Sequence, residues 1–154
     1  MLITVLLILH GLAAVILIGA ISHQMIGSWK TKSAPSNTFF QSLVNTRGAT
    51  YTNAVVILYV LTSIGGGIIY PTYVMDVKGS LTDAQMLSAI GAFELKEHYA
   101  IVGLAMLPTY WYLWKKVPPA EHRITRAINT TVICAMVWTS FLVGHVLNNI
   151  KGLI

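Results

Sequence analysis

The sequence has few charged residues: Asp, Glu, Lys and Arg make up only 10% of its 154 positions. Soluble domains carry about 25% charged residues, so this scarcity argues against a soluble protein. Basic residues outnumber acidic ones by ten to five. They lie between apolar runs rather than in one patch, which does not indicate a nucleic-acid partner. The one cysteine, Cys134, excludes an intrachain disulfide and a cysteine-cluster metal site, and its apolar surroundings predict a small buried residue.

Long apolar runs dominate the sequence, which is 55% hydrophobic with a mean hydropathy of +0.69. About 20 apolar residues cross a bilayer as a helix. Four runs predict transmembrane helices, over residues 2–26, 53–70, 93–114 and 124–149. The first run has no Lys or Arg before it and exceeds the about 7–15 residues of a secretory signal. We therefore predict an all-α integral membrane protein in the lipid bilayer, a single four-helix up-down bundle over residues 1–154.

Turn residues predict how the four helices are connected. Pro71 is expected to end the second helix. Thr82 and Gln85 have capping-box spacing, which predicts a short helix over residues 83–90. A second short helix, lying at the membrane interface, is expected over residues 38–44, and a kink is expected at Pro108.

Basic residues predict the orientation of the bundle. The first and third connections contain seven of them, Lys30, Lys32, Arg47, Lys115, Lys116, Arg123 and Arg126, and the opposite side contains three, Lys78, Lys96 and Lys151. Because cytoplasmic loops are enriched in Lys and Arg, both termini and the second connection are expected on the non-cytoplasmic side. A bacterial inner membrane is the expected location.

Three histidines are expected to meet in the outer half of this bundle. His10 lies inside the first apolar run, His98 at the outer start of the third helix, and His145 near the outer end of the fourth. At about 1.5 Å per residue, His10 is about 13 Å deep and His145 about 7 Å. His23 and His122 fall on the cytoplasmic side. An ionisable residue inside a membrane helix is by default a functional-site hypothesis.

Imidazoles that face each other from different helices are the groups that hold a haem in a helical bundle. His10 and His145 are the predicted pair of ligands to a haem b, or to another metal, with His98 close by. Gly66, inside the run from Gly65 to Gly67, would let the cofactor approach the second helix closely. The alternative is that each histidine only hydrogen-bonds a neighbouring helix and the glycines only pack helices.

The segment from Phe93 to His98 is the second concentration of chemical groups. Glu94 and His98 are four residues apart and share a helical face, and Glu97 lies nearby. These three residues are candidates for a proton or quinol site beside the haem. An ordinary helix start is the alternative, because carboxylates in a first turn are favoured by the helix dipole. The Glu-x-x-His spacing of di-iron bundles does not occur.

The first helix contains the segment Leu9-His10-Gly11-Leu12-Ala13-Ala14, followed by Gly19. Over about 20 residues it resembles the first helix of small four-helix membrane proteins, the copper-resistance D-like family and the membrane-bound protoporphyrinogen oxidases. The resemblance implies that His10 is the haem-linked residue. Residues 16–22 contain neither the tryptophan nor the Leu-Pro-Arg segment of those oxidases, so the resemblance does not extend to their enzymatic activity.

The leading hypothesis is a b-type cytochrome-like subunit that passes electrons between a quinol pool and a partner in a larger membrane complex. A chain this short, with no soluble catalytic domain, is expected to work beside other membrane subunits. One alternative is a cofactor-free accessory subunit that packs against a larger respiratory or photosynthetic assembly. Another is a metal or proton transporter, although transport sites usually lie near the bilayer midplane. Whether the chain is an enzyme stays open.

Overall fold

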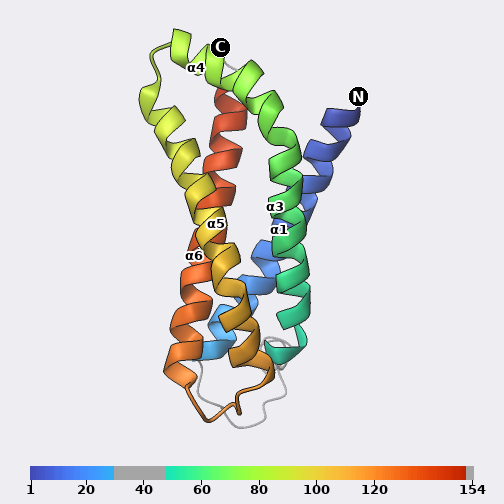
Figure 1. Ribbon diagram of the computed structural model, residues 1–154, viewed down its shortest axis with the longest axis vertical. Coiled ribbons are helices and arrows are strands. Elements are labelled where there is room, and N and C mark those ends of the chain that lie inside the picture. Colours follow the sequence, from blue (N-terminus) through green and yellow to red (C-terminus); the bar gives the residue numbers. More distant parts are fainter. Residues whose placement is uncertain (30–47, 152–154) are drawn as a thin grey trace, which may run out of the picture.

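The computed structural model describes residues 1–29 and 48–151, of which 91% are helical and none is in a strand. Figure 1 shows long helices running side by side. The elements, in order, are α1 (Leu2–Trp29), η1 (Gly48–Thr50), α3 (Thr52–Tyr73), η2 (Val74–Lys78), α4 (Gly79–Asp83), α5 (Leu87–Lys115) and α6 (Arg123–Lys151). The short helix expected over residues 38–44 lies outside the described residues. The all-helical prediction is confirmed.

Three helical stretches are long and apolar enough to cross a membrane: Leu2–Trp29, Thr52–Asp83 and Arg123–Asn149. The structure therefore supports a membrane protein built as a helix bundle. The predicted fourth span is contained in α5, which is long enough to cross but less apolar. Its first half carries the charged segment from Glu94 to Glu97, and its second half carries Pro108 and several Tyr and Trp side chains.

The second long helix does not end at Pro71, which corrects the sequence-based boundary. Helix α3 continues through Pro71 to Tyr73, and the five-residue π-helix η2 follows directly. A proline in a membrane helix is tolerated when local π adjustments satisfy the freed backbone groups. At the end of α3, the backbone N–H of Val74 donates to the carbonyl oxygens of Tyr70 and Pro71. The helical path therefore runs on to Asp83.

The predicted short helix over residues 83–90 is also wrong. Helix α4 ends at Asp83, the chain turns through Gln85 with a positive φ of 55°, and α5 begins at Leu87. Thr82 does not cap a following helix; its hydroxyl donates to the carbonyl oxygen of Lys78, four residues back, at 2.8 Å. The Thr82 side chain therefore bonds back to the preceding turn of the helical path and does not cap the next helix.

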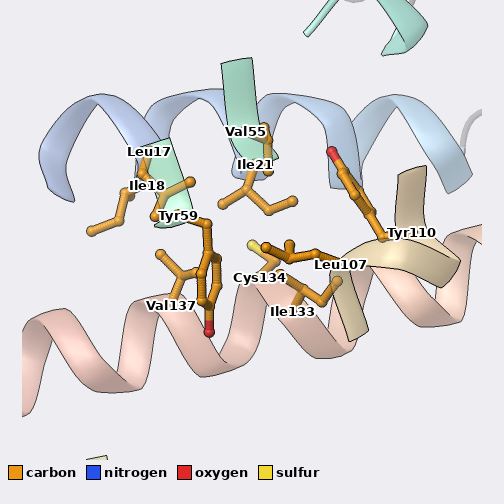
Figure 2. Close-up of a cluster of buried hydrophobic side chains, with 10 residues drawn as sticks. All are labelled: Leu17, Ile18, Ile21, Val55, Tyr59, Leu107, Tyr110, Ile133, Cys134 and Val137. Atoms are coloured by element: carbon orange, nitrogen blue, oxygen red, sulfur yellow. The ribbon is translucent and has the colours of Figure 1, made fainter. Parts of the chain in front are cut away.

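Figure 1 places the start of α1, the end of α6 and helix α4 at the same end of the bundle, here called the α4 end. Helix α1 packs against α3 and α6, and α5 packs mainly against α6. Ten buried side chains form the hydrophobic core: Leu17, Ile18, Ile21, Val55, Tyr59, Leu107, Tyr110, Ile133, Cys134 and Val137 (Figure 2). The predicted burial of Cys134 is confirmed. Because the cluster starts at Leu17 on α1 and stops at Val137 on α6, it fills the half of the bundle away from the α4 end.

Candidate functional site

His10 lies in the first third of α1 and faces two glycines of α3. A Cβ built on Gly65 would lie 3.3 Å from His10 Nδ1, and one built on Gly66 would lie 3.4 Å from Cε1. The backbone of Thr62 lies beside the same ring. His10 Nδ1 is buried and has no hydrogen-bond partner. Gly65 and Gly66 therefore make room for an imidazole whose Nδ1 makes no hydrogen bond of ordinary geometry, although the Thr62 backbone lies within reach of the ring.

His145 is exposed near the end of α6 and is held by neighbours on its own helix. The Nδ2 of Asn149 lies 3.2 Å from His145 Nε2 and donates to the backbone oxygen of His145 at 2.9 Å. The ring of Phe141 stacks on the imidazole, with centroids 6.1 Å apart and planes inclined by 4°. His145 is therefore already engaged on one ring nitrogen and one face.

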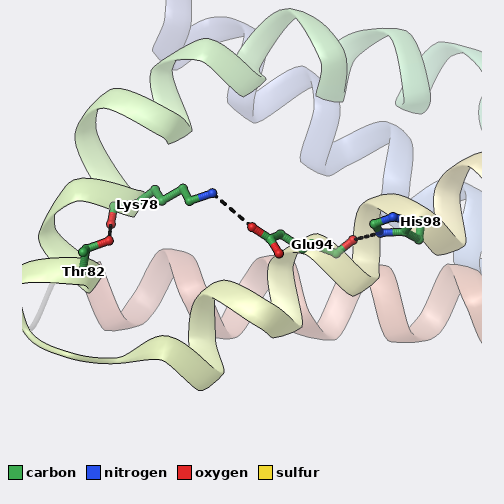
Figure 3. A network of polar contacts seen from close by, with 4 residues as sticks. All are labelled: Lys78, Thr82, Glu94 and His98. Atoms are coloured by element: carbon green, nitrogen blue, oxygen red, sulfur yellow. Dashed lines mark hydrogen bonds and ion pairs between the residues drawn. The ribbon is translucent and has the colours of Figure 1, made fainter.

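His98 is exposed in the first half of α5. Its Nδ1 lies 2.7 Å from the backbone oxygen of Glu94 (Figure 3). Because a carbonyl oxygen only accepts, Nδ1 carries the proton in this contact, which leaves Nε2 pointing away from the helix backbone. In the described residues, His98 and His145 make no hydrogen bond or ring contact with His10.

The three histidines share the α4 half of the bundle but form no metal-binding cluster there. Helices α1 and α5 begin at that end and α6 finishes there (Figure 1). Over residues 1–29 and 48–149, no group of three or more His, Cys, Asp or Glu side chains is arranged to hold a metal ion. The described residues therefore contain no cluster of three ligands that would include the predicted pair, His10 and His145.

The carboxylates of α5 have different surroundings. Glu94 forms an ion pair with Lys78, at 3.0 Å between Nζ and Oε1, and both side chains remain partly exposed (Figure 3). Glu97 interacts electrostatically with Lys96, the next residue back along α5. Sequence reasoning missed the pair of Lys78 and Glu94, because it depends on the helical path continuing past Pro71.

Lys96 occupies the centre of the polar groups at the α4 end. Its Nζ lies 4.4 Å from the ring centroid of Phe93, and 3.4 Å from the position that a Cβ on Gly144 of α6 would take. It also lies close enough to His10 to interact electrostatically. Within the described part of the chain, no carboxylate lies within ion-pair distance of this ammonium. Lys96 thus links α5 to α1 and α6 while keeping its charge unpaired.

An aromatic group from α3 and α5 adjoins Lys96. The rings of Tyr73 and Phe93 stack with centroids 3.5 Å apart and planes inclined by 7°, and Tyr70 lies 6.3 Å from Phe93. The hydroxyl of Tyr73 is buried and has no hydrogen-bond partner. Only the continuation of α3 through Pro71 shows that Tyr70 and Tyr73 reach Phe93.

No family model, curated protein or solved structure matches this chain. Its class is therefore defined by the helices and by the side chains just described. These give a helical membrane protein in which His10, Lys96, Glu94, Glu97 and His98 lie at the α4 end, away from the hydrophobic core.

Proposed function

We propose that this chain is a b-type cytochrome-like subunit that transfers electrons between a quinol pool and a partner subunit of a larger membrane complex. The observation that carries the proposal is the buried, unpartnered Nδ1 of His10 against the glycines of α3. A buried polar nitrogen without a partner is costly. Iron coordination would remove that cost.

A haem b would supply one-electron transfer, and the chain's own residues would hold it. His10 provides an imidazole nitrogen that makes no hydrogen bond, and Gly65 and Gly66 give its ring room against α3. His145 is the second proposed ligand; its Nε2 would have to leave Asn149. Phe141 already fixes the plane of the His145 ring. Glu94, Glu97 and His98 are the groups proposed to exchange protons at the same end.

The proposal includes four membrane spans, with α5 as the fourth, and a non-cytoplasmic location for the α4 end in a bacterial inner membrane. Helix α1 begins and helix α6 ends at the α4 end (Figure 1). At the other end, the turn between α5 and α6 is flanked by Lys115, Lys116, Arg123 and Arg126. The positive-inside rule supports this orientation. The exposed apolar side chains spread over α1, α3, α5 and α6 suit contact with lipid and with other membrane subunits.

A reduced-minus-oxidised visible spectrum of the purified protein tests the proposal. The wild-type protein is expected to show a b-type α-band, and His10→Ala and His145→Ala are each expected to abolish it. His122→Asn is the matched control, a histidine at the opposite end whose φ of 48° suits asparagine. A flat spectrum from folded wild-type protein would overturn haem binding. Loss of the band in the control as well would overturn the ligand assignment.

A second candidate is a cofactor-free accessory subunit of a larger membrane complex. It is favoured by one observation: His98 and His145 each have a hydrogen-bond partner on their own helix. Such contacts satisfy a histidine without any cofactor. The same spectrum separates the two candidates, because an accessory subunit would co-purify with its partners while contributing no Soret or α-band.

A further inference from the structure

We propose that Tyr73 and Lys96 form the binding site for a quinone headgroup at the α4 end of the bundle. This assignment rests on the quinol reaction of the proposed function and names the residues that receive the quinone. It assigns the quinone not to His98 and Glu94, which each have a hydrogen-bond or ion-pair partner, but to two groups that make no hydrogen bond or ion pair among the described residues.

The two residues come from different helices, and each of them contacts the ring of Phe93. Phe93 of α5 stacks on Tyr73 of α3, and the same ring lies 4.4 Å from the ammonium of Lys96. The Tyr73 hydroxyl is buried without a partner, and Lys96 has no ion pair among the described residues. An unpartnered buried hydroxyl and an unpaired ammonium are both unfavourable unless a ligand bonds to them.

A quinone headgroup matches the chemistry of these residues. It is a flat ring with carbonyl oxygens that accept hydrogen bonds, and Lys96 and Tyr73 both donate. The bond from Lys96 would be charge-assisted, which is the stronger type. Tyr70 and Phe93 supply apolar aromatic surface beside the two donors, and 38% of the Tyr70 side chain is exposed. An anionic phosphate would satisfy Lys96 but would leave the aromatic rings without a role.

The position of Lys96 also suits electron transfer. Its ammonium lies against Gly144 of α6 and interacts electrostatically with His10 of α1. A quinone bonded to Lys96 would therefore lie at the same end of the bundle as His10, the proposed haem ligand. Glu97, which interacts with both Lys96 and Tyr73, is the nearest carboxylate for a proton released by a quinol.

Saturation binding of radiolabelled decylubiquinone to the purified protein in dodecyl maltoside is the test. Lys96→Met is expected to weaken binding at least about tenfold, because it removes a charge-assisted bond. Tyr73→Phe keeps the ring stack and removes only the hydroxyl, and we expect about two- to tenfold weaker binding. Lys116→Met and Tyr112→Phe, the same substitutions toward the other end of α5, are expected to bind like wild type.

Thermal unfolding separates a binding role from a structural one. Tyr73→Phe removes an unpartnered hydroxyl, so its unfolding midpoint is expected to equal or exceed that of wild type, and this variant keeps the test open if Lys96→Met fails to fold. Wild-type affinity in folded Tyr73→Phe and Lys96→Met would overturn the proposal. No saturable binding to wild type would also overturn it.

Two further experiments test whether the ligand is a phosphate and whether quinone binding depends on the haem. Phosphatidylglycerol mixed micelles test a phosphate ligand: Lys96-dependent lipid retention without Lys96-dependent quinone binding would overturn the quinone assignment. The His145→Ala variant tests independence from haem. If it lacks the α-band yet binds decylubiquinone in a Lys96-dependent manner, the quinone site stands. Residue-specific quinone binding with a flat wild-type spectrum would likewise support this inference while the electron-transfer function fails.

Discussion

Tyr110 of α5 donates a hydrogen bond to Oε1 of Gln24 on α1, and both side chains are fully buried. The amide nitrogen of Gln24 in turn donates to the backbone oxygen of Gly48 at 3.0 Å and to the hydroxyl of Thr52 at 3.2 Å. One glutamine therefore connects α5, α1 and the start of α3. These bonds lie away from the α4 end, so they stabilise the fold without belonging to the proposed site.

Tyr110→Phe is expected to destabilise the protein by about 1–3 kcal/mol, because it leaves the buried Gln24 oxygen without its donor. The unfolding midpoint in detergent measures the effect, and the visible spectrum is expected to stay unchanged. Tyr112→Phe is the control, since Tyr112 is exposed on the same helix. Equal midpoints for the two variants would contradict a structural role for the pair of Tyr110 and Gln24.

Arg126 closes the turn between α5 and α6 by donating to backbone oxygens. Its guanidinium reaches Leu113 at 2.8 Å, Pro119 at 3.0 Å, Pro118 at 3.0 Å and Val117 at 3.1 Å. These carbonyls include some that the end of α5 leaves without helical partners. The side chain is 6% exposed. Sequence reasoning counted Arg126 as one of seven orientation charges, but the structure makes it a capping residue as well.

Arg126→Met is expected to lower the free energy of unfolding by about 3 kcal/mol, because several carbonyl oxygens lose a charged donor. Arg126→Lys is expected to fall between this variant and wild type, since a lysine cannot reproduce the planar fork of donors. Lys115→Met, an exposed basic residue beside the same turn, is the control. A midpoint for Arg126→Met within error of the control would show that water satisfies these carbonyls instead.

Sequence patterns predicted the helices well because apolar length alone identifies a membrane-crossing segment. The glycine run predicted a close approach to this helix, but the group that lies at Gly66 in the structure is the His10 imidazole and not a cofactor. The Lys78–Glu94 pair and the Tyr73–Phe93 stack were not predictable. Both require α3 to continue beyond Pro71, and the sequence-based rule that proline ends a helix gave the opposite boundary.

The positions of the histidines could also be predicted only in part from the sequence. Depth along each helix follows from counting residues, and so all three were expected in one half of the bundle. The direction of each side chain depends on how the helices rotate about their axes, which an apolar sequence leaves open. His10 faces α3, whereas His98 and His145 are exposed and bonded within their own helices. Lys96, which lies close to Gly144 of α6, makes a further contact between helices there.

Gly103 of α5 is required for the packing of α3. A Cβ at this position would overlap the hydroxyl of Tyr59, which donates to the backbone oxygen of Ala100 at 3.3 Å. Gly103→Ala is expected to destabilise the protein by about 1–3 kcal/mol through overpacking. Combining it with Tyr59→Phe is expected to recover part of this loss, as measured by the unfolding midpoint.

Gly91→Ala is the matched control on the same helix, because no atom lies within 4 Å of its Cβ position. This substitution is expected to be neutral or to stabilise α5 by up to about 1 kcal/mol, since alanine favours helix over glycine. The same destabilisation in both variants would mean that the contact between Gly103 and Tyr59 is not the cause.

The three consecutive glycines of α3 provide a graded test of the His10 environment. Alanine at Gly65 or Gly66 would place a methyl group 3.3 Å or 3.4 Å from the imidazole, whereas alanine at Gly67 would meet nothing within 4 Å. Gly65→Ala and Gly66→Ala are therefore expected to displace His10 and to reduce the haem α-band. Gly67→Ala is expected to keep the wild-type spectrum.

The unfolding midpoints of these three variants show whether a weaker α-band comes from the cofactor site or from a less stable fold. Helix propensity favours alanine equally at each position, by up to about 1 kcal/mol, so any difference among the variants reflects the neighbouring imidazole. A reduced α-band with a normal midpoint in Gly65→Ala and Gly66→Ala would tie the glycines to cofactor binding. Identical spectra in all three would mean that the ring shifts by a few tenths of an ångström without consequence, and the glycines would then serve helix packing alone.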